Sequence, residues 1–283
     1  MSTPNAPLLE LKDLNVTLGH GLRSTKILTD VNISLQRGST VALVGESGSG
    51  KSTIAKTIIG IYRADSGSIR FGDTELVGAS RRTRTSVRRQ IQLIPQNPYS
   101  SLDPRRTIGQ TLAEAIDPVF ARVGRNRDRI VAALEAVSLD ERAMRRYPHE
   151  FSGGQRQRIA IARALATDPE VVIADEITSA LDVSTQAEIL ELLTRLRAEL
   201  QLTVLFISHN LAVVNQICDD VVVLLNGSVV ESGPVDRVFA DPTAEYTRTL
   251  IESVPGGAGF DLMAPLTSSI TIPAQSDSSG GTA

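Results

Sequence analysis

The sequence comprises 283 residues with a net charge of −3, a pI of about 5.7 and one cysteine. This length suits one large or two modest domains with a substantial core, and the charge gives no overall basic field, so we expect no nucleic-acid partner. The lone Cys218 excludes an internal disulfide and suits a reducing compartment. No apolar run reaches the length of a membrane span.

Two stretches near the start of the chain alternate apolar and polar residues. Residues 8–17 and 27–35 both follow this pattern, which predicts half-buried strands on either side of a loop at 19–24. We expect these strands to form an antiparallel β layer beside a larger sheet.

A glycine-rich stretch with the pattern GxxxxGKS joins an apolar run at 41–44 to a helical pattern at 54–59. It consists of Gly45, Glu46, Ser47, Gly48, Ser49, Gly50, Lys51, Ser52 and Thr53. Its glycines allow successive N–H groups to turn around an anion, and the helix start adds a positive dipole end. Lys51 is therefore predicted to reach the β- and γ-phosphates of a nucleoside triphosphate, and Ser52 to bind its magnesium. The alternative is a flexible turn that binds nothing.

Past this helix, a turn at 65–67 precedes a predicted strand at 68–71, and residues 76–89 carry an arginine cluster. No aromatic residues interleave with these arginines and the rest of the chain is acidic, so the cluster favours a solvated helix face over a nucleic-acid patch. Its members are Arg81, Arg82, Arg84, Arg88 and Arg89.

The middle of the chain changes from strand to helix periodicity. A strand at 91–95 ends in turn-forming residues at 96–104, and helical spacing runs from 107 to about 166. This order predicts a helical insertion between two strands of one sheet.

Strands and helices alternate in the rest of the chain, and the dipeptide Asn226-Gly227 predicts a hairpin. Beyond residue 255 the composition predicts a disordered tail at 256–283. Strands are expected at 171–174, 204–207, 220–225 and 228–232, and helices at 156–166, 183–200, 210–217, 234–240 and 243–252.

Four predicted strands are each followed by polar groups. These are the glycine-rich loop, Gln96, the pair Asp175-Glu176, and His209. The carboxyl ends of parallel strands meet at one edge of a sheet, so one site can collect all of them. Asp175 is placed to hold magnesium, directly or through water. Glu176 is placed to orient or deprotonate an attacking water, and His209 to hydrogen-bond the γ-phosphate.

The segment Phe151-Ser152-Gly153-Gly154-Gln155 resembles the signature of ABC-type ATPase domains, normally Leu-Ser-Gly-Gly-Gln. The resemblance covers residues 8–255. It implies an α/β P-loop NTPase core with a mainly parallel sheet, an N-terminal antiparallel β layer and a helical subdomain inserted at about 97–166. It also implies ATP and Mg²⁺ as cofactors, with Lys51, Gln96, Glu176 and His209 catalytic. Ser52, Gln96 and Asp175 would then hold the metal, and Asp182 would belong to a nucleotide-site loop.

The signature itself has the features of a second anion site. Ser152, Gly153, Gly154 and Gln155 begin a predicted helix, where backbone N–H groups and the dipole favour a phosphate. In the family this subdomain points its signature outward. The resemblance therefore implies a head-to-tail pair of ATPase domains, identical or paralogous, that clamps two ATP molecules.

Residues 96–105 and 242–255 narrow the resemblance to the oligopeptide, dipeptide and nickel importer ATPases. This implies a subunit that powers peptide uptake through two membrane permease subunits at the cytoplasmic face, with an extracytoplasmic solute-binding protein acting indirectly. The alternatives are uptake of nickel or another small solute, and a regulatory P-loop ATPase without a transport role. A kinase or GTPase fits less well, because the signature is present and an Asn-Lys-x-Asp guanine motif is absent.

Besides Phe151, two further positions depart from the family pattern. Ile177 replaces the usual proline, and Leu18 occupies the place of an adenine-stacking aromatic, for which His20 or Arg23 is a candidate substitute. Tyr246 and Leu250 are expected to serve only as packing residues of a C-terminal helix.

Overall fold

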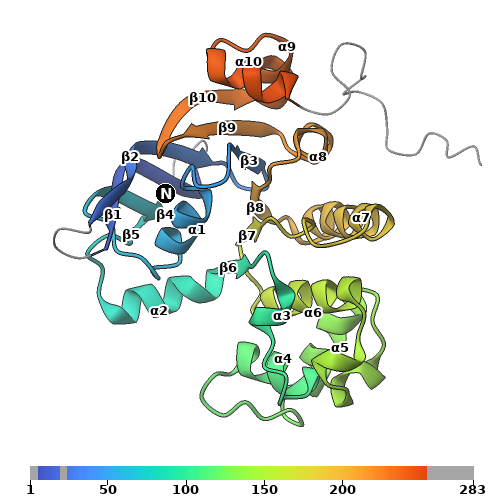
Figure 1. The fold of residues 1–283 in the computed structure, drawn as a ribbon. Coiled ribbons are helices and arrows are strands. Elements are labelled where there is room, and N and C mark those ends of the chain that lie inside the picture. Colours follow the sequence, from blue (N-terminus) through green and yellow to red (C-terminus); the bar gives the residue numbers. More distant parts are fainter. Residues whose placement is uncertain (1–5, 20–23, 254–283) are drawn as a thin grey trace, which may run out of the picture.

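The computed structural model describes residues 6–19 and 24–253 (Figure 1). Its largest element is a six-stranded sheet in the order β10-β9-β3-β8-β7-β6, in which only the pair β9 and β10 is antiparallel. The mainly parallel sheet predicted from the sequence is thereby confirmed. Its strands are β3 (Thr40–Val44), β6 (Ile91–Ile94), β7 (Val171–Asp175), β8 (Thr203–Ile207), β9 (Asp220–Leu225) and β10 (Ser228–Pro234).

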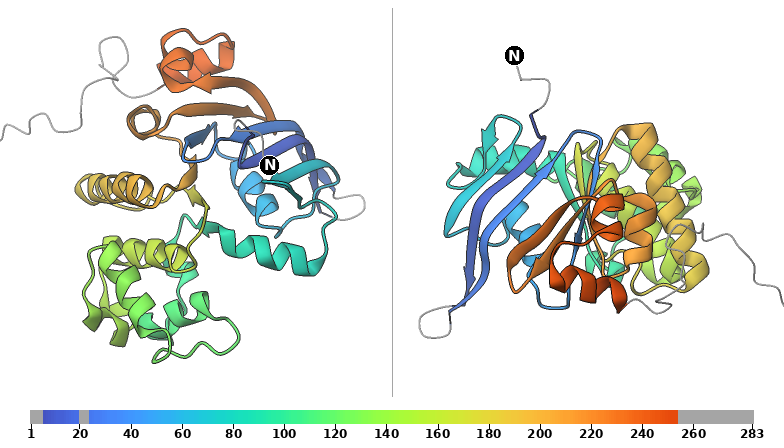
Figure 2. Two further views of the ribbon diagram at one scale, coloured as in Figure 1. Left: turned by 180° about the vertical axis from the view of Figure 1, so that it is seen from behind. Right: turned by 90° about the horizontal axis from the view of Figure 1, so that it is seen from above.

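A smaller antiparallel sheet, in the order β2-β1-β4-β5, packs beside the first (Figures 1 and 2). The expected pairing of the first two strands is confirmed, with Leu9 opposite Leu35. The turn expected at 65–67 is partly wrong, because β4 begins at Ser66, and residues 66–71 pair with β1. The strands are β1 (Leu9–Leu18), β2 (Thr25–Leu35), β4 (Ser66–Phe71) and β5 (Thr74–Glu75).

Helices cover the large sheet and form a separate group at one end of it. In Figure 1 the green helices α3 to α6 gather on the side away from the small sheet, where the sequence predicted a helical insertion. The helices are α1 (Lys51–Ile58), α2 (Arg81–Gln90), α3 (Pro98–Ser101), α4 (Ile108–Ile116), α5 (Arg127–Ala136), η2 (Glu141–Arg145), η3 (Pro148–Glu150), α6 (Gly153–Leu165), α7 (Val183–Leu200), α8 (Leu211–Ile217), α9 (Val235–Ala240) and α10 (Glu245–Glu252).

The two faces of the large sheet belong to two different cores. On β3, Ala42 and Val44 join the core shared with α4 to α9, while Val41 and Leu43 join the core shared with α1 and the small sheet. This division follows from the two-residue period of a strand. Burial on both faces explains why these strands read as continuous apolar runs.

The local predictions for the hairpin, the turn region and the tail have different outcomes. The hairpin at Asn226-Gly227 is present, with φ of +47° and +80° at these two residues. The turn region expected at 96–104 contains the short helix α3. The tail predicted at 256–283 lies outside the described residues. Within the described ranges, none of the helices is long and apolar enough to cross a membrane.

Candidate functional site

The glycine-rich loop leaves β3 and turns directly into α1. Lys51, the first residue of α1, is only 5% exposed, and its Nζ donates to the carbonyl oxygens of Gly45 and Glu46, each at 2.7 Å. Burial lowers the pKa of the Lys51 ammonium, and the carboxylates of Glu176 and Asp175 oppose part of that effect. The ammonium therefore lies inside the curve of the loop and close to the acidic end of β7.

Ser52 and Asp175 meet across 123 residues of sequence. The Ser52 hydroxyl donates to Asp175 Oδ1 at 3.2 Å. Asp175 is 7% exposed, and burial raises the pKa of its carboxyl, while the hydrogen bond from Ser52 partly opposes this rise. A hydroxyl and a carboxylate at this spacing are oxygen donors of the kind that Mg²⁺ takes from a protein when phosphates and water complete its shell. The donor set thus fits magnesium.

Glu176 is flanked on both carboxylate oxygens. Gln96 Nε2 donates to Oε2 at 2.7 Å, and His209 Nδ1 lies 3.7 Å from Oε1, a pair that is ionic only when His209 is protonated. Glu176 has a left-handed φ of +47°, and its N–H donates to the carbonyl of Ile207 at 3.0 Å. The ends of β6, β7 and β8 thus converge on one carboxylate, as the strand order requires.

The signature residues begin helix α6, in the group of helices at one end of the large sheet. Ser152 and Gln155 form a capping box, in which the Ser152 hydroxyl accepts from Gln155 N at 3.3 Å and Gln155 Oε1 accepts from Ser152 N at 3.1 Å. Both residues are exposed, whereas Gly153 and Gly154 are half-buried. Among residues 6–19 and 24–253, no hydrogen bond or ion pair joins this segment to residues 45–53.

Phe151, in place of the usual leucine, belongs to the core that the large sheet shares with α4 to α9. It is 4% exposed, and the guanidinium of Arg146 lies 4.1 Å from the centre of its ring. Such a cation–π contact compensates an arginine for lost hydration. The larger side chain is therefore accommodated by a stacked arginine.

Two predicted site positions have structural partners of their own. Asp182 caps α7 by accepting from the Thr185 amide, and hydrogen bonds from Ser184 and Thr185 lower the pKa of its carboxyl to about 2. Ile177, in place of the proline that the resemblance implied, is 2% exposed and belongs to the core shared with α4 to α9. Leu18, at the end of β1, packs against the second core, and His20 and Arg23 lie outside the described residues.

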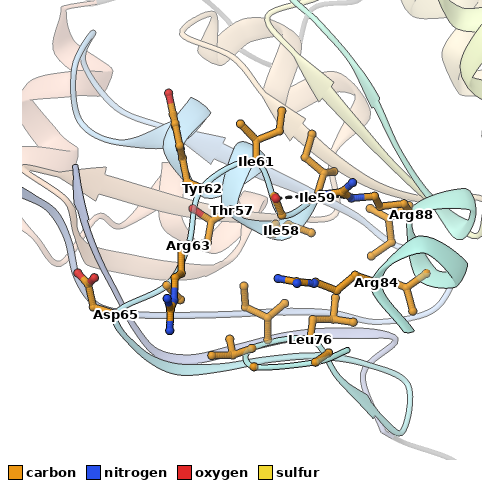
Figure 3. A pocket seen from close by; sticks show the side chains of 18 residues that line it. Thr57, Ile58, Ile59, Ile61, Tyr62, Arg63, Asp65, Leu76, Arg84 and Arg88 are labelled. Carbon is orange, nitrogen blue, oxygen red and sulfur yellow. Dashed lines mark hydrogen bonds between the residues drawn. The ribbon is translucent and has the colours of Figure 1, made fainter. Parts of the chain in front are cut away.

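The arginine cluster on α2 is partly a structural tie. Arg88 donates to the carbonyls of Ile59 and Gly60 at 2.8 and 2.9 Å, and Arg89 donates to the carbonyl of Ile116 at 2.8 Å. Arg84 and Arg88 line a groove of about 460 Å³ between α2, β5 and the C-terminal end of α1 (Figure 3). The groove lies at the opposite end of α1 from Lys51, so it is separate from the phosphate loop.

The structure adds two contacts that sequence periodicity did not reveal. The Glu46 N–H donates to the hydroxyl of Tyr246 at 3.1 Å, so Tyr246 is more than the packing residue we expected. Gln96 Nε2 also lies 3.4 Å from the hydroxyl of Ser179. The sequence pattern around Tyr246 indicated only a packed helix, so it gave no signal for the first contact.

Known proteins are similar to this chain in sequence and in fold. The sequence model of the ABC transporter family matches residues 28–179. The chain is 45% identical over 237 residues to the di/tripeptide transport ATP-binding protein DppF of Pseudomonas aeruginosa, which covers 83% of this chain and 73% of that protein. It is 43% identical over 251 residues to the oligopeptide transport ATP-binding protein OppF of Bacillus subtilis, and this match covers 88% of this chain and 82% of that protein.

Two solved structures share the fold. CbiO1 of Clostridium perfringens, described as part of the ABC transporter complex cbiONQ, superposes with a TM-score of 0.74 at 29% identity, covering 88% of this chain and 96% of that one. The ATP-binding cassette MJ0796, described as a dimer in a post-hydrolysis state bound to ADP and Pi, superposes with a TM-score of 0.70 at 30% identity. It covers 80% of this chain and 98% of that one.

Proposed function

The chain belongs to the ABC transporter family of ATP-binding proteins, and from that premise we propose that it powers peptide import by hydrolysing ATP at the site described above. As a member of this group it is the ATP-binding and ATP-hydrolysing subunit of an ABC importer. The solute, the metal, the roles of single residues and the partners are our proposals. The observation that carries the metal and the residue roles is the convergence of Ser52, Asp175, Gln96 and Glu176 at one sheet edge.

We assign triphosphate binding to the loop at residues 45–53. Its backbone amides and the dipole of α1 would contact the phosphates, and Lys51 would exchange the carbonyls of Gly45 and Glu46 for phosphate oxygens. The Lys51 ammonium already lies inside the loop, 2.7 Å from both carbonyl oxygens. A small rotation of its side chain would bring it to the phosphates without moving the loop backbone, which supports this role.

We assign the magnesium ion to Ser52 and Asp175, with Gln96 as a further contact. When bound, the ion would neutralise charge on the phosphates. The buried carboxylate of Asp175 needs a cationic partner to remain ionised at low cost, and its raised pKa is consistent with that need.

We assign water activation to Glu176. Gln96 donates a hydrogen bond to one of its oxygens, and His209 flanks the other. The carboxylate therefore has a fixed direction relative to the end of β7. In this role Glu176 accepts a proton from the attacking water, and His209 holds the γ-phosphate and the carboxylate in line. Gln96 would couple the nucleotide-bound state of the site to the neighbouring helices, through the segment that leads to α3.

We propose that a second ATPase subunit, identical or paralogous, completes each site. The exposed Ser152 and Gln155 and the start of α6 offer backbone amides to a phosphate, but they lie in a different subdomain from residues 45–53. A head-to-tail dimer brings the signature of one subunit to the phosphate loop of the other. The description of MJ0796 as a dimer supports this arrangement.

We propose that the solute is an oligo- or dipeptide, because the relatives DppF and OppF are named for peptide transport. The described residues contain no membrane-spanning helix. We propose that this subunit acts with two permease subunits at the cytoplasmic face of the membrane, with a solute-binding protein on the other side, because its relatives are named as transport ATP-binding proteins. The segment 96–102, which begins at Gln96, is our candidate for the permease contact.

The test of the hydrolytic role is Glu176→Gln, which keeps the size of the side chain and removes its basicity. We expect ATP binding to persist, turnover to fall by about 10²–10⁴-fold, and an ATP-dependent dimer to accumulate in light scattering. Glu191→Gln, at an exposed position of α7, is the matched control and should hydrolyse ATP normally. Unchanged turnover in Glu176→Gln would refute the assigned base.

The companion variant Lys51→Ala tests the phosphate loop. It should weaken ATP binding in an equilibrium titration, whereas Lys12→Ala, at an exposed position of β1, should leave the affinity unchanged. Wild-type affinity in Lys51→Ala would count against the assignment of residues 45–53.

A further inference from the structure

The C-terminal part of the described chain touches the phosphate loop from outside. The hydroxyl of Tyr246, on α10, accepts a hydrogen bond from Glu46 N at 3.1 Å, although 200 residues separate them. In the turn between β9 and β10, Gly227 N donates to the carbonyl of Ser49 at 2.9 Å. The hairpin and the last helix therefore contact the loop at separate points.

Tyr246 and Lys51 hold the same peptide unit. The carbonyl of Gly45 accepts from Lys51 Nζ at 2.7 Å, and the N–H of Glu46, which belongs to the same planar amide, donates to Tyr246. Because the amide is rigid, fixing its N–H also fixes the direction of its carbonyl. The tyrosine hydroxyl thus determines where the carbonyl contacted by Lys51 points.

The position of Tyr246 depends on an anchor at the start of α10. Glu231 on β10 accepts from the amide and hydroxyl of Thr243, both at 2.8 Å, and from the amide of Ala244 at 3.1 Å. Desolvation alone would raise the pKa of Glu231, but the side chain of Thr247 and these hydrogen bonds from Thr243 and Ala244 outweigh it and lower the pKa to about 2. Tyr246 and Leu250 are half-buried and pack against the main core. The helix therefore presents the hydroxyl from a fixed support.

We propose that Tyr246 is a positioning residue for the phosphate loop, through which α10 sets the affinity of the site for ATP. This inference rests on the phosphate-binding role proposed above for residues 45–53. A loop peptide that is held before binding loses less conformational freedom when the triphosphate arrives, so the free energy of binding is more favourable. Without the hydroxyl, the Glu46 N–H loses this partner, and of the two contacts only the one from Lys51 Nζ to the Gly45 carbonyl still holds the amide.

The test is Tyr246→Phe in the full chain, because this change removes one oxygen and keeps the packed ring. A single neutral hydrogen bond of this kind supports an expected three- to tenfold rise in the Kd and KM for ATP. We expect kcat to remain within about twofold and the Tm to shift by no more than about 2 °C, because the chemistry and the core are unchanged. Tyr62→Phe, in the groove beside α2 (Figure 3), is the matched control and should leave the Kd unchanged.

A second variant tests the path through the anchor. Glu231→Gln should raise the KM in the same direction as Tyr246→Phe, and the double variant should be no worse than the single tyrosine change, because both act on one contact. The inference is overturned if Tyr246→Phe binds ATP like the wild type, or if its kcat falls in step with a lower Tm. If Lys51→Ala weakens ATP binding and Tyr246→Phe does not, only this inference fails. When Lys51→Ala also binds normally, the proposed phosphate loop fails with it.

Discussion

Two glycines of the phosphate loop should respond very differently to the same substitution. Gly45 has φ of +147° and Gly48 has φ of +84°, so an alanine is strained at either position, by about 1–2 kcal/mol for a left-handed residue. A Cβ on Gly48 meets nothing within 4 Å. A Cβ on Gly45 would lie 2.1 Å from the backbone carbonyl oxygen of Leu224.

The Leu224 carbonyl cannot easily retreat, because β9 is held between β3 and β10. Overpacking against fixed atoms costs a further 1–3 kcal/mol, approximately. We therefore expect Gly48→Ala to lower the free energy of unfolding by about 1–2 kcal/mol and Gly45→Ala to lower it by about 2–5 kcal/mol.

The measurement is urea denaturation followed by far-ultraviolet circular dichroism, in the absence of nucleotide so that binding does not contribute. Gly48→Ala serves as the control for backbone strain, and the difference between the two variants isolates the contact with β9. Equal losses in the two variants would refute the reasoning, since they would mean that Leu224 does not confine the loop.

Two further changes test the anchors of neighbouring helices. The pKa of Glu231 is about 2 against an ordinary 4.5, so its contribution to stability is complete above about pH 4.5 and is lost as the pH falls toward 2. Glu231→Gln should flatten the decline of the Tm across that window, and an unchanged acid slope would contradict the assignment. Asn210→Ala removes the side-chain oxygen that accepts from Ala212 N and Val213 N at the start of α8. It should lower the free energy of unfolding in urea by about 1 kcal/mol, and a neutral result would mean that solvent replaces the cap.

The sequence by itself determined the features that depend on a few adjacent residues. The pattern from Gly45 to Thr53 specifies a strand, an anion-binding turn and a helix, because glycine conformations and helix starts are local properties. Asn226-Gly227 specified its hairpin for the same reason, since both residues take positive φ. The resemblance at residues 151–155 led to the family that the comparisons then established.

Strand order was only partly accessible from the sequence. Apolar runs ending in polar residues predicted that Gln96, Asp175, Glu176 and His209 share a sheet edge, and the sheet order places β6, β7 and β8 side by side. The pairings themselves, Ser52 with Asp175 and Gln96 with Glu176, required the register of those strands. The boundaries of the domain at 8–255 and of its tail remain predictions.

Only the tertiary structure decided which distant groups hold the phosphate loop. Tyr246 reaches Glu46, and Leu224 confines Gly45, because the C-terminal hairpin returns to pair with β3. Periodicity records which face of an element is apolar, but it carries no information about which segment lies opposite. Contacts between residues about 200 positions apart therefore depend on how the whole sheet is assembled, and the sequence pattern around Tyr246 indicated only a packed helix.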